Sequence, residues 1–472
     1  MVNNMNRRDA LAAMAAAGAV MFGAGSVRAK NAKRPPNIIF ILADDLGYGG
    51  LGCYGQEKIL TPRLDRMAVE GMRFTQAYAG STVCAPSRCS LMTGMHQGHA
   101  FVRGNTSMVD RVRVPLRPED TTVAEVLKSA GYATGLVGKW GLGDTGTSGA
   151  PNAKGFDEFF GYTDQYLAHN YYPETLWRND TEVPLEGNVL EAPNICKTCT
   201  TYSHDLFTKE ALGFIERHKG APFFLYLAYT LPHANNEAKR LREHGMEVPS
   251  DVPYSDKSWP PAQRGHAAMI TRLDQDVGKV LDLLEEQGIA KDTLVIFTSD
   301  NGPHKEGGAD PTFFEDSGPL RGIKRDLYEG GIRVPAIAWW PGTIAPKTES
   351  DYPWAFWDFL PTAAELAGQK APTCDGISIA PNLLGRPEQQ KHHEYLYWEF
   401  HEGAFKQAVR MGYWKAVRNK QDAPIELYNL DQDFAETTNV AGEHPEVVAQ
   451  AAALFSEART ESPHWPARHA PA

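Results

Sequence analysis

Residues 37–45 read NIIFILADD, an unbroken apolar run that ends in two adjacent carboxylates, Asp44 and Asp45. Such a run is typical of a strand buried on both faces, as the strands of a parallel sheet are. In α/β proteins, ligands bind beyond the carboxyl ends of these strands. We therefore expect residues 37–42 to form a central strand, with Asp44 and Asp45 at a ligand site. Exposed loop acids are the alternative for this pair taken alone.

Helical and apolar strand patterns alternate along most of the remaining chain. Helices are expected at 122–130, 204–218, 267–287 and 355–367, and strands at 133–137, 223–229, 293–297 and 334–340. This alternation is the signature of strand–helix–strand units. The expected fold class is therefore α/β, with a large, mostly parallel sheet flanked by helices in a domain that spans residues 30–385.

Two other regions have a different texture. Past Pro381, short strand patterns precede a helical pattern at 445–458, which predicts a small antiparallel sheet plus a helix in a C-terminal subdomain, residues 386–472. Those strands are expected at 395–400, 406–411, 414–418 and 426–430. Residues 146–202 show little periodicity and many aromatics, and we expect a long, ordered loop region over the site.

The N-terminus has the features of an export signal. Arg7 and Arg8 precede an alanine-rich apolar run to Gly25, and a small-x-small pattern ends at Ala29. These features predict a bacterial twin-arginine signal peptide at 1–29. A membrane anchor is the alternative, but the run falls short of the roughly 20 residues that span a bilayer. We expect a mature protein in the periplasm or secreted, with no membrane attachment after cleavage.

Charge and cysteine content limit the partners. The chain has 47 basic and 58 acidic residues and a net charge of −11, which argues against binding to nucleic acid. Its six cysteines would lie in a compartment that permits disulfides. Cys196 and Cys199 have the spacing of half a zinc site, but no second pair completes it. A local disulfide or two free thiols is expected.

A second polar pair follows the strand expected at 293–297. The two pairs together, Asp44 with Asp45 and Asp300 with Asn301, offer only oxygen ligands. Oxygen ligands suit a hard cation such as calcium or magnesium, whereas zinc would favour histidine or cysteine. The sequence therefore predicts a site for one hard cation where these strands end.

Residues 84–94 read CAPSRCSLMTG, with a cysteine shortly before a proline that can begin a helix. The sulfur of Cys84 would then lie near the positive end of the helix dipole. That position suits a thiolate nucleophile, a metal ligand or an anion site, and a small buried residue is the bland alternative.

Six motifs occur in an order that resembles the formylglycine-dependent sulfatases of the alkaline-phosphatase-like superfamily. They are Ala43–Asp45, Cys84–Gly94, Gly138–Trp140, Pro232–His233, Ser299–Gly302 and Leu320–Lys324. The resemblance implies hydrolysis of a sulfate ester, with Cys84 oxidised to formylglycine (3-oxoalanine) by a maturation enzyme. It also implies one calcium ion, and these site residues: Asp44, Asp45, Asp300, Asn301 and residue 84 at the metal, and Arg88, Lys139, His233 and Lys324 around the sulfate.

These residue types suit that chemistry. A hydrated aldehyde carries two hydroxyls on one carbon, so one can attack sulfur and the other can lose its proton to release sulfate. Calcium and fixed cations favour the negative charge at the sulfuryl group. His233 could protonate the departing alcohol, a role that needs a pKa near the working pH.

One motif departs from the family, which often has GKWHLG where this chain has Gly141. The histidine thought to help eject sulfate is therefore missing. His169 and His304 are candidates to replace it, and we expect His169→Ala to impair turnover more than His304→Ala.

An exo-acting enzyme on a sulfated carbohydrate is the expected function, with an aryl sulfate as a proxy substrate. The acidic surface, the export signal and the aromatics at 146–202 and 398–402 favour it. Candidate sugar contacts are His169, Asn170, Asn235, His304, His401 and Gln407. The alternatives are a phosphate or phosphonate ester hydrolase of the same superfamily, and an exported glycan-binding pseudoenzyme with an unmodified Cys84.

Overall fold

The computed structural model describes residues 34–467, and the signal peptide expected at 1–29 lies outside that range. The apolar run forms strand β1 (Asn37–Ala43), in which every residue is buried. It pairs in parallel with β10 (Thr293–Ser299) on one side and β9 (Phe223–Ala228) on the other. β1 therefore lies inside the sheet, as its sequence predicts.

The large sheet has 11 strands among the described residues, in the order β12-β2-β11-β10-β1-β9-β3-β4-β5-β6, with β13 beside β2. The strands on the β9 side are β3 (Ala133–Lys139), β4 (Glu158–Tyr162), β5 (Thr175–Arg178) and β6 (Thr181–Pro184). Those on the β10 side are β11 (Arg333–Trp339), β2 (Met72–Tyr78), β12 (Thr348–Ser350) and β13 (Trp354–Ala355). Pairing is parallel from β10 through β4, and β11, β5 and β6 bring in antiparallel neighbours. The expected mostly parallel sheet is confirmed.

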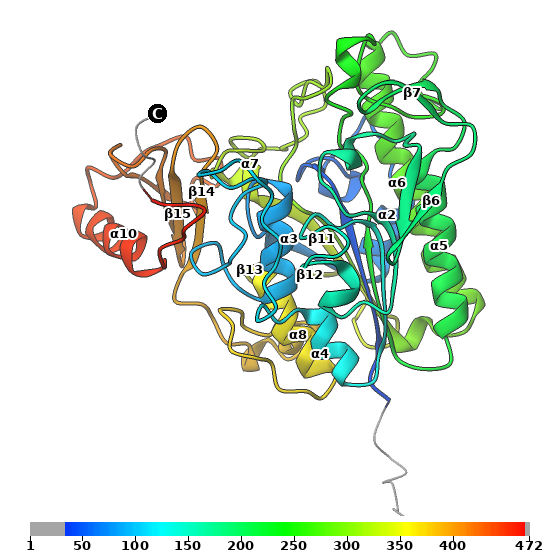
Figure 1. Ribbon diagram of the computed structural model, residues 1–472. Coiled ribbons are helices and arrows are strands. Elements are labelled where there is room, and N and C mark those ends of the chain that lie inside the picture. The colour runs from blue at the N-terminus through cyan, green and yellow to red at the C-terminus, as the bar shows by residue number, and fades with distance from the viewer. Residues whose placement is uncertain (1–33, 468–472) are drawn as a thin grey trace, which may run out of the picture. The chain divides into compact units, whose positions relative to one another are not determined.

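Helices cover both faces of this sheet. Ile39 and Ile41 of β1 pack into one apolar cluster, and Ile38 and Phe40 pack into another on the opposite face. The first cluster includes residues of α2 (Pro62–Glu70), α5 (Ser203–His218) and α6 (Pro261–Glu286). The second includes residues of α3 (Cys84–Thr93), α4 (Val123–Ser129) and α8 (Phe359–Leu366) (Figure 1). No helix in the described part of the chain is both long and apolar enough to cross a membrane.

The segment 146–202 contains more regular structure than the sequence indicates. β4, β5 and β6 extend the large sheet, and β7 (Val189–Ala192) pairs with β8 (Ile195–Thr198) in a separate hairpin. The expectation of a loop region was therefore wrong for these strands. β5 to β8 have four residues each with exposed positions, so they lack the apolar run that marks a buried strand. β4 is largely buried but has only five residues. Cys196 and Cys199 form a local disulfide.

The C-terminal strands form a separate four-stranded antiparallel sheet, as expected. Its strands in order are β14 (Leu396–Phe400), β15 (Lys406–Met411), β16 (Trp414–Arg418) and β17 (Glu426–Asn429). One face packs on α10 (Pro445–Glu457), where Val409 of β15 and Phe455 belong to one apolar cluster. Trp398 lies in a different cluster with Tyr78 of β2, so the small sheet is fixed to the edge of the large one. The boundary at 385 stays a prediction.

Candidate active site

The expected catalytic and metal-site residues gather at the carboxyl ends of neighbouring parallel strands. Asp44 and Asp45 follow β1, Lys139 ends β3, and His233 follows β9. Asp300 and Asn301 follow β10, Cys84 is the first residue of α3, and Lys324 comes from the loop before α7 (Glu329–Ile332). All of these side chains are buried. The topology thus brings together residues that are up to 280 positions apart in the chain, from 44 to 324.

The two acidic turns hold each other. Asp45 adopts a left-handed backbone conformation with φ 65°, and its N–H donates to Asp300 Oδ1 at 3.1 Å. Asn301 Nδ2 donates to Asp45 Oδ1 at 2.7 Å. These bonds lock the turn after β1 to the turn after β10, so the oxygen ligands converge.

Three buried cations neutralise the three carboxylates. Arg88 donates to Asp300 Oδ2 from its Nη2 at 2.8 Å and lies 3.3 Å from Asp44 Oδ2. Lys139 Nζ lies 2.6 Å from Asp44 Oδ2, and Lys324 Nζ lies 2.7 Å from Asp45 Oδ2. A buried charge without a partner is costly, so each cation stabilises the acid that it contacts.

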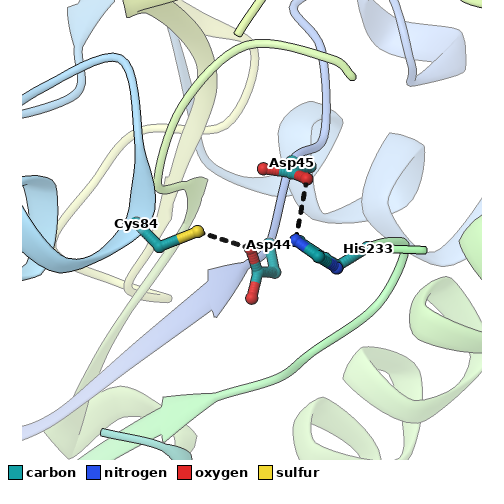
Figure 2. A group of neighbouring side chains, drawn as sticks. All are labelled: Asp44, Asp45, Cys84 and His233. Carbon is teal, nitrogen blue, oxygen red and sulfur yellow. Dashed lines mark hydrogen bonds and ion pairs between the residues drawn. The ribbon is translucent and has the colours of Figure 1, made fainter. Parts of the chain in front are cut away.

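Cys84 points at Asp44, with Sγ 3.4 Å from Oδ1 (Figure 2). Burial, together with the charge of Asp44, raises the pKa of the Cys84 thiol well above its ordinary value. Lys139 and Lys324 only partly oppose this effect. The thiol therefore stays protonated near neutral pH, and the thiolate nucleophile considered from the sequence does not suit this environment.

His233 lies on the opposite side of Asp44 from Cys84, with its Nε2 3.4 Å from Asp45 Oδ2 (Figure 2). Its Nδ1 lies 2.6 Å from the carbonyl oxygen of Ala234, which can only accept, so Nδ1 carries the proton. Nε2 lies 3.2 Å from Lys324 Nζ. Burial and the charge of Lys324 lower the pKa of His233 well below its ordinary value, so the folded protein holds this imidazole neutral.

The oxygen donors fit a divalent cation. Asn301 Oδ1 is buried and has no hydrogen-bond partner within residues 34–467, a situation that costs about 1–3 kcal/mol unless a ligand satisfies it. Asp44, Asp45, Cys84 and His233 have donor atoms within 4.8 Å of one another. Carboxylate and amide oxygens are the donors that a hard cation prefers.

Two further histidines flank His233. The ring of His169 stacks on that of His233 at 4.7 Å, and its Nδ1 lies 3.1 Å from Glu237 Oε2. The ring of His304 lies 5.8 Å away, and its Nε2 lies 3.3 Å from the carbonyl oxygen of Pro232. The His169 side chain keeps 17% of its surface exposed, whereas His304 is buried. Of the two, His169 is the one that a ligand could reach.

The other expected sugar contacts have partners inside the protein. Asn235 Oδ1 accepts from two backbone N–H groups, those of residues 237 and 238, and its Nδ2 donates to Glu247. Gln407 Nε2 donates to Tyr397 and to the carbonyl of Phe455. His401 Nε2 lies 3.1 Å from Glu399 Oε1, and Asn170 Oδ1 accepts from Tyr172 N. A role for these four side chains in substrate binding stays a prediction.

Sequence reasoning missed two residues of this region. Glu306 bridges Lys324 and Arg325, with Oε2 3.3 Å from the Lys324 Nζ and Oε1 2.6 Å from the Arg325 Nη1. Although burial opposes the shift, Lys324 lowers the pKa of Glu306 to about 2. The sequence feature that could have identified Glu306 is its position, a carboxylate shortly after Asp300 in the same loop. The second missed residue is Gln165, whose amide lies beside Gly141. No sequence motif includes Gln165.

Paired acids at strand ends with fixed cations around them suit the binding of an anionic group on an α/β scaffold. The Sulfatase family model matches residues 36–369, and that of the C-terminal region of N-sulphoglucosamine sulphohydrolase matches residues 323–460. The chain belongs to the sulfatase family and is a sulfuric ester hydrolase.

Curated relatives and solved structures agree with this assignment. Arylsulfatase A of Homo sapiens is 34% identical over 469 residues, covering 88% of this chain and 86% of the human protein. N-acetylgalactosamine-6-sulfatase of Rattus norvegicus is 34% identical over 436 residues, covering 88% of this chain and 77% of the rat protein. The crystal structure of Ps i-CgsB in complex with k-i-k-neocarrahexaose superposes with a TM-score of 0.77 at 28% identity, covering 92% of this chain and 95% of that one.

Proposed function

We propose that the enzyme removes sulfate from a sulfated carbohydrate in an exo-acting manner, with residue 84 in the formylglycine form and one calcium ion bound. The observation that carries the proposal is the position of Cys84. Its sulfur lies 3.4 Å from Asp44, in the field of Lys139 and Lys324. Its raised pKa nevertheless disfavours the thiolate form. A hydrated formylglycine at residue 84 would supply a hydroxyl nucleophile and a second hydroxyl through which sulfate can leave.

Asp44, Asp45, Asp300 and Asn301 would hold the calcium ion. Calcium in this place supplies positive charge that polarises the sulfuryl oxygens. Arg88 keeps the carboxylates of Asp44 and Asp300 in position through the contacts of its guanidinium group. This arrangement is fixed before substrate binds, so little reorganisation is needed as charge develops.

Lys139 and Lys324 bind the sulfate group. Each ammonium has three N–H donors, and Lys139 uses one on Asp44. Lys324 contacts Asp45, His233 and Glu306, and so connects the metal ligands to the imidazole. The two lysines provide the electrostatic attraction for an anionic ester.

His233 protonates the leaving alcohol. In the folded protein without substrate its imidazole is neutral because of burial and Lys324. A bound anion beside Nε2 offsets the lysine charge and raises the pKa of His233, so the proton is taken up with the substrate. The same Nε2 then delivers it to the departing oxygen.

Two relatives support a carbohydrate substrate. The rat relative is named for a sulfated amino sugar, and the solved structure of Ps i-CgsB holds an oligosaccharide. His169, beside His233 and partly exposed, is the sugar contact that the geometry favours most. An aryl sulfate serves as a proxy substrate, in keeping with the resemblance to arylsulfatase A.

Export and maturation complete the proposal. The pattern at 1–29 supports twin-arginine export to the periplasm or the medium, after which the mature chain needs no membrane. Oxidation of Cys84 requires a formylglycine-generating maturation enzyme as a transient partner.

A panel of sulfated monosaccharides, with phosphate and phosphonate esters as controls, tests the proposal. We expect sulfate release from one class of sulfated sugar and from an aryl sulfate, and far slower hydrolysis of the phosphorus esters. A preference for the phosphorus esters would contradict the proposed substrate, and binding of sulfated sugars without any hydrolysis would favour the pseudoenzyme.

A further inference from the structure

Gln165 is a buried amide without a partner in the part of the chain that the structure describes. Gln165 is only 8% exposed, and neither its Nε2 nor its Oε1 makes a hydrogen bond within residues 34–467. Buried polar groups in proteins are nearly always paired, because an unpaired one loses its hydration without compensation. A buried amide with both ends unpaired therefore points to a partner from outside the chain.

Gly141 provides the room for this amide. Its φ is +80°, and a Cβ built on it would lie 1.7 Å from Gln165 Nε2. A side chain at position 141 and the amide of Gln165 thus exclude each other in this conformation. The Gly141 N–H donates to the carbonyl oxygen of Thr163 at 3.1 Å, which holds the two segments together.

The amide belongs to the wall of a pocket next to residue 84. The same pocket is lined by Gly141, Ala85 and Asn105, and Ala85 directly follows Cys84. Asn105 Oδ1 accepts from Ala85 N at 3.1 Å, so the start of α3 is tied to this wall. Gly141 comes two residues after Lys139, whose ammonium contacts Asp44. Gln165 therefore shares a pocket with the residue that follows Cys84 and with the segment that follows β3.

We propose that Gln165 contacts the substrate, and that its amide N–H donates to a sulfate oxygen of the ester bound at residue 84. The inference rests on the proposed function. It assigns to the Gln165 amide the space that a side chain at position 141 would occupy. It also differs from the expectation that His169 or His304 takes that place, because both of those flank His233.

A glutamine works differently from a histidine in this position. Its amide donates a hydrogen bond without gaining or losing a proton, so its contribution to substrate binding is constant with pH. Lys139 and Lys324 attract the anion by charge, and Gln165 fixes its orientation. It takes no proton from residue 84 or from the substrate.

Two substitutions separate substrate contact from packing. Gln165→Met keeps a similar volume without polar atoms, and should lower kcat/KM for an aryl sulfate by about 10- to 100-fold, the usual effect of losing one hydrogen bond to a charged group. Gln165→Glu keeps the shape but adds a negative charge beside the anion. The ratio of its kcat/KM to that of wild type should rise as the pH falls and the carboxylate takes up a proton, whereas the ratio for Gln165→Met should stay constant with pH.

Gln390→Met is the matched control. Gln390 is a similarly buried amide, 7% exposed, but its Nε2 donates to the carbonyls of Ser378 and Lys391. This variant should keep the wild-type kcat/KM. A loss in Gln165→Met and Gln165→Glu that is equal at every pH, and that follows the loss of thermal stability, would mean packing only and would overturn the inference.

A stability measurement and a binding measurement do not depend on turnover. Gly141→His alone should lower Tm, because the left-handed backbone at position 141 disfavours a side chain and because imidazole and amide compete for one place. Adding Gln165→Gly relieves only the second cause and should restore part of the loss. Calcium-loaded protein that retains the Cys84 thiol should bind inorganic sulfate about tenfold more tightly than its Gln165→Met variant, and equal binding would overturn the inference. If wild type hydrolyses no sulfate ester, the proposed function fails. If wild type is active and both Gln165 variants match it at all pH values, this inference fails.

Discussion

Lys139 Nζ lies 2.6 Å from Asp44 Oδ2, while the other oxygen of the same carboxylate faces the sulfur of Cys84 at 3.4 Å. Lys139 ends β3 and Asp44 follows β1, and the two strands are separated in the sheet by β9 alone. Although burial opposes the shift, Lys139 and its neighbouring cations hold the pKa of Asp44 far below its usual range. The pair thus keeps a negative charge next to residue 84 inside a buried site.

Removal of Lys139 should destabilise the folded protein as well as slow the reaction. In calcium-free protein, Lys139→Ala removes the nearest cation of the buried Asp44 and leaves Arg88 as the cation in contact with it. Breaking a buried pair costs up to about 3–5 kcal/mol. Urea unfolding measures the loss. Lys128→Ala is the control, because Lys128 pairs with Asp157 at the surface, where its side chain is 48% exposed. The control should change the free energy of unfolding by less than about 1 kcal/mol, and an equal effect of both variants would contradict this account.

Chelation of calcium should abolish sulfatase activity and lower the stability of the folded protein. Calcium binding to the folded state alone would stabilise it by about 2.7 kcal/mol at 100 times Kd, so a chelator should lower Tm and calcium should restore it. Asn301→Ala, which removes the unpaired Oδ1, should reduce the calcium-dependent shift in Tm. Full sulfatase activity in the presence of a chelator would refute the metal assignment.

The two histidines beside His233 should differ in their effects on turnover. His169→Ala removes a partly exposed ring that stacks on His233 at 4.7 Å, and should lower kcat more than His304→Ala does. Because His304 is buried, both variants are to be assayed well below their own Tm values. Equal or reversed effects on kcat would show that the choice of His169 is mistaken.

His96 should make the protein less stable in acid. Burial lowers its pKa to about 4, although Asp375 opposes the shift. An unfolded histidine has a pKa of about 6.5, so between these values the unfolded chain binds a proton that the folded chain does not. The free energy of unfolding therefore falls as the pH drops through this window, by up to about 1.4 kcal/mol per pH unit from this group.

His96→Asn tests this pH dependence. Asparagine can still accept from the Gly98 N–H, as His96 Nδ1 does, but it does not titrate. The variant should lose less stability than wild type between pH 6.5 and 4, by the slope given above. His392→Asn, at an exposed position, should keep the wild-type slope. Parallel stability curves for wild type and His96→Asn would contradict the prediction.

The fold could be predicted from the sequence where a buried element gives a long run of apolar residues. β1 and β10 each contain a continuous apolar run because both faces of the sheet are covered, and the polar residues that follow them mark the site. β5 to β8 could not be predicted, since strands of four residues with exposed positions carry no such run. The motif residues of the site could be predicted because they lie at strand ends and in a distinctive cysteine stretch. Gln165 could not, because its place depends on the contact with Gly141, which only the folded chain makes.

The most direct test of the central claim is the mass of the tryptic peptide that contains residue 84, from enzyme isolated from its native host. The account predicts a peptide in which the Cys84 sulfur is replaced by an aldehyde oxygen, in protein that releases sulfate. Active enzyme whose residue 84 is entirely an unmodified thiol would contradict it.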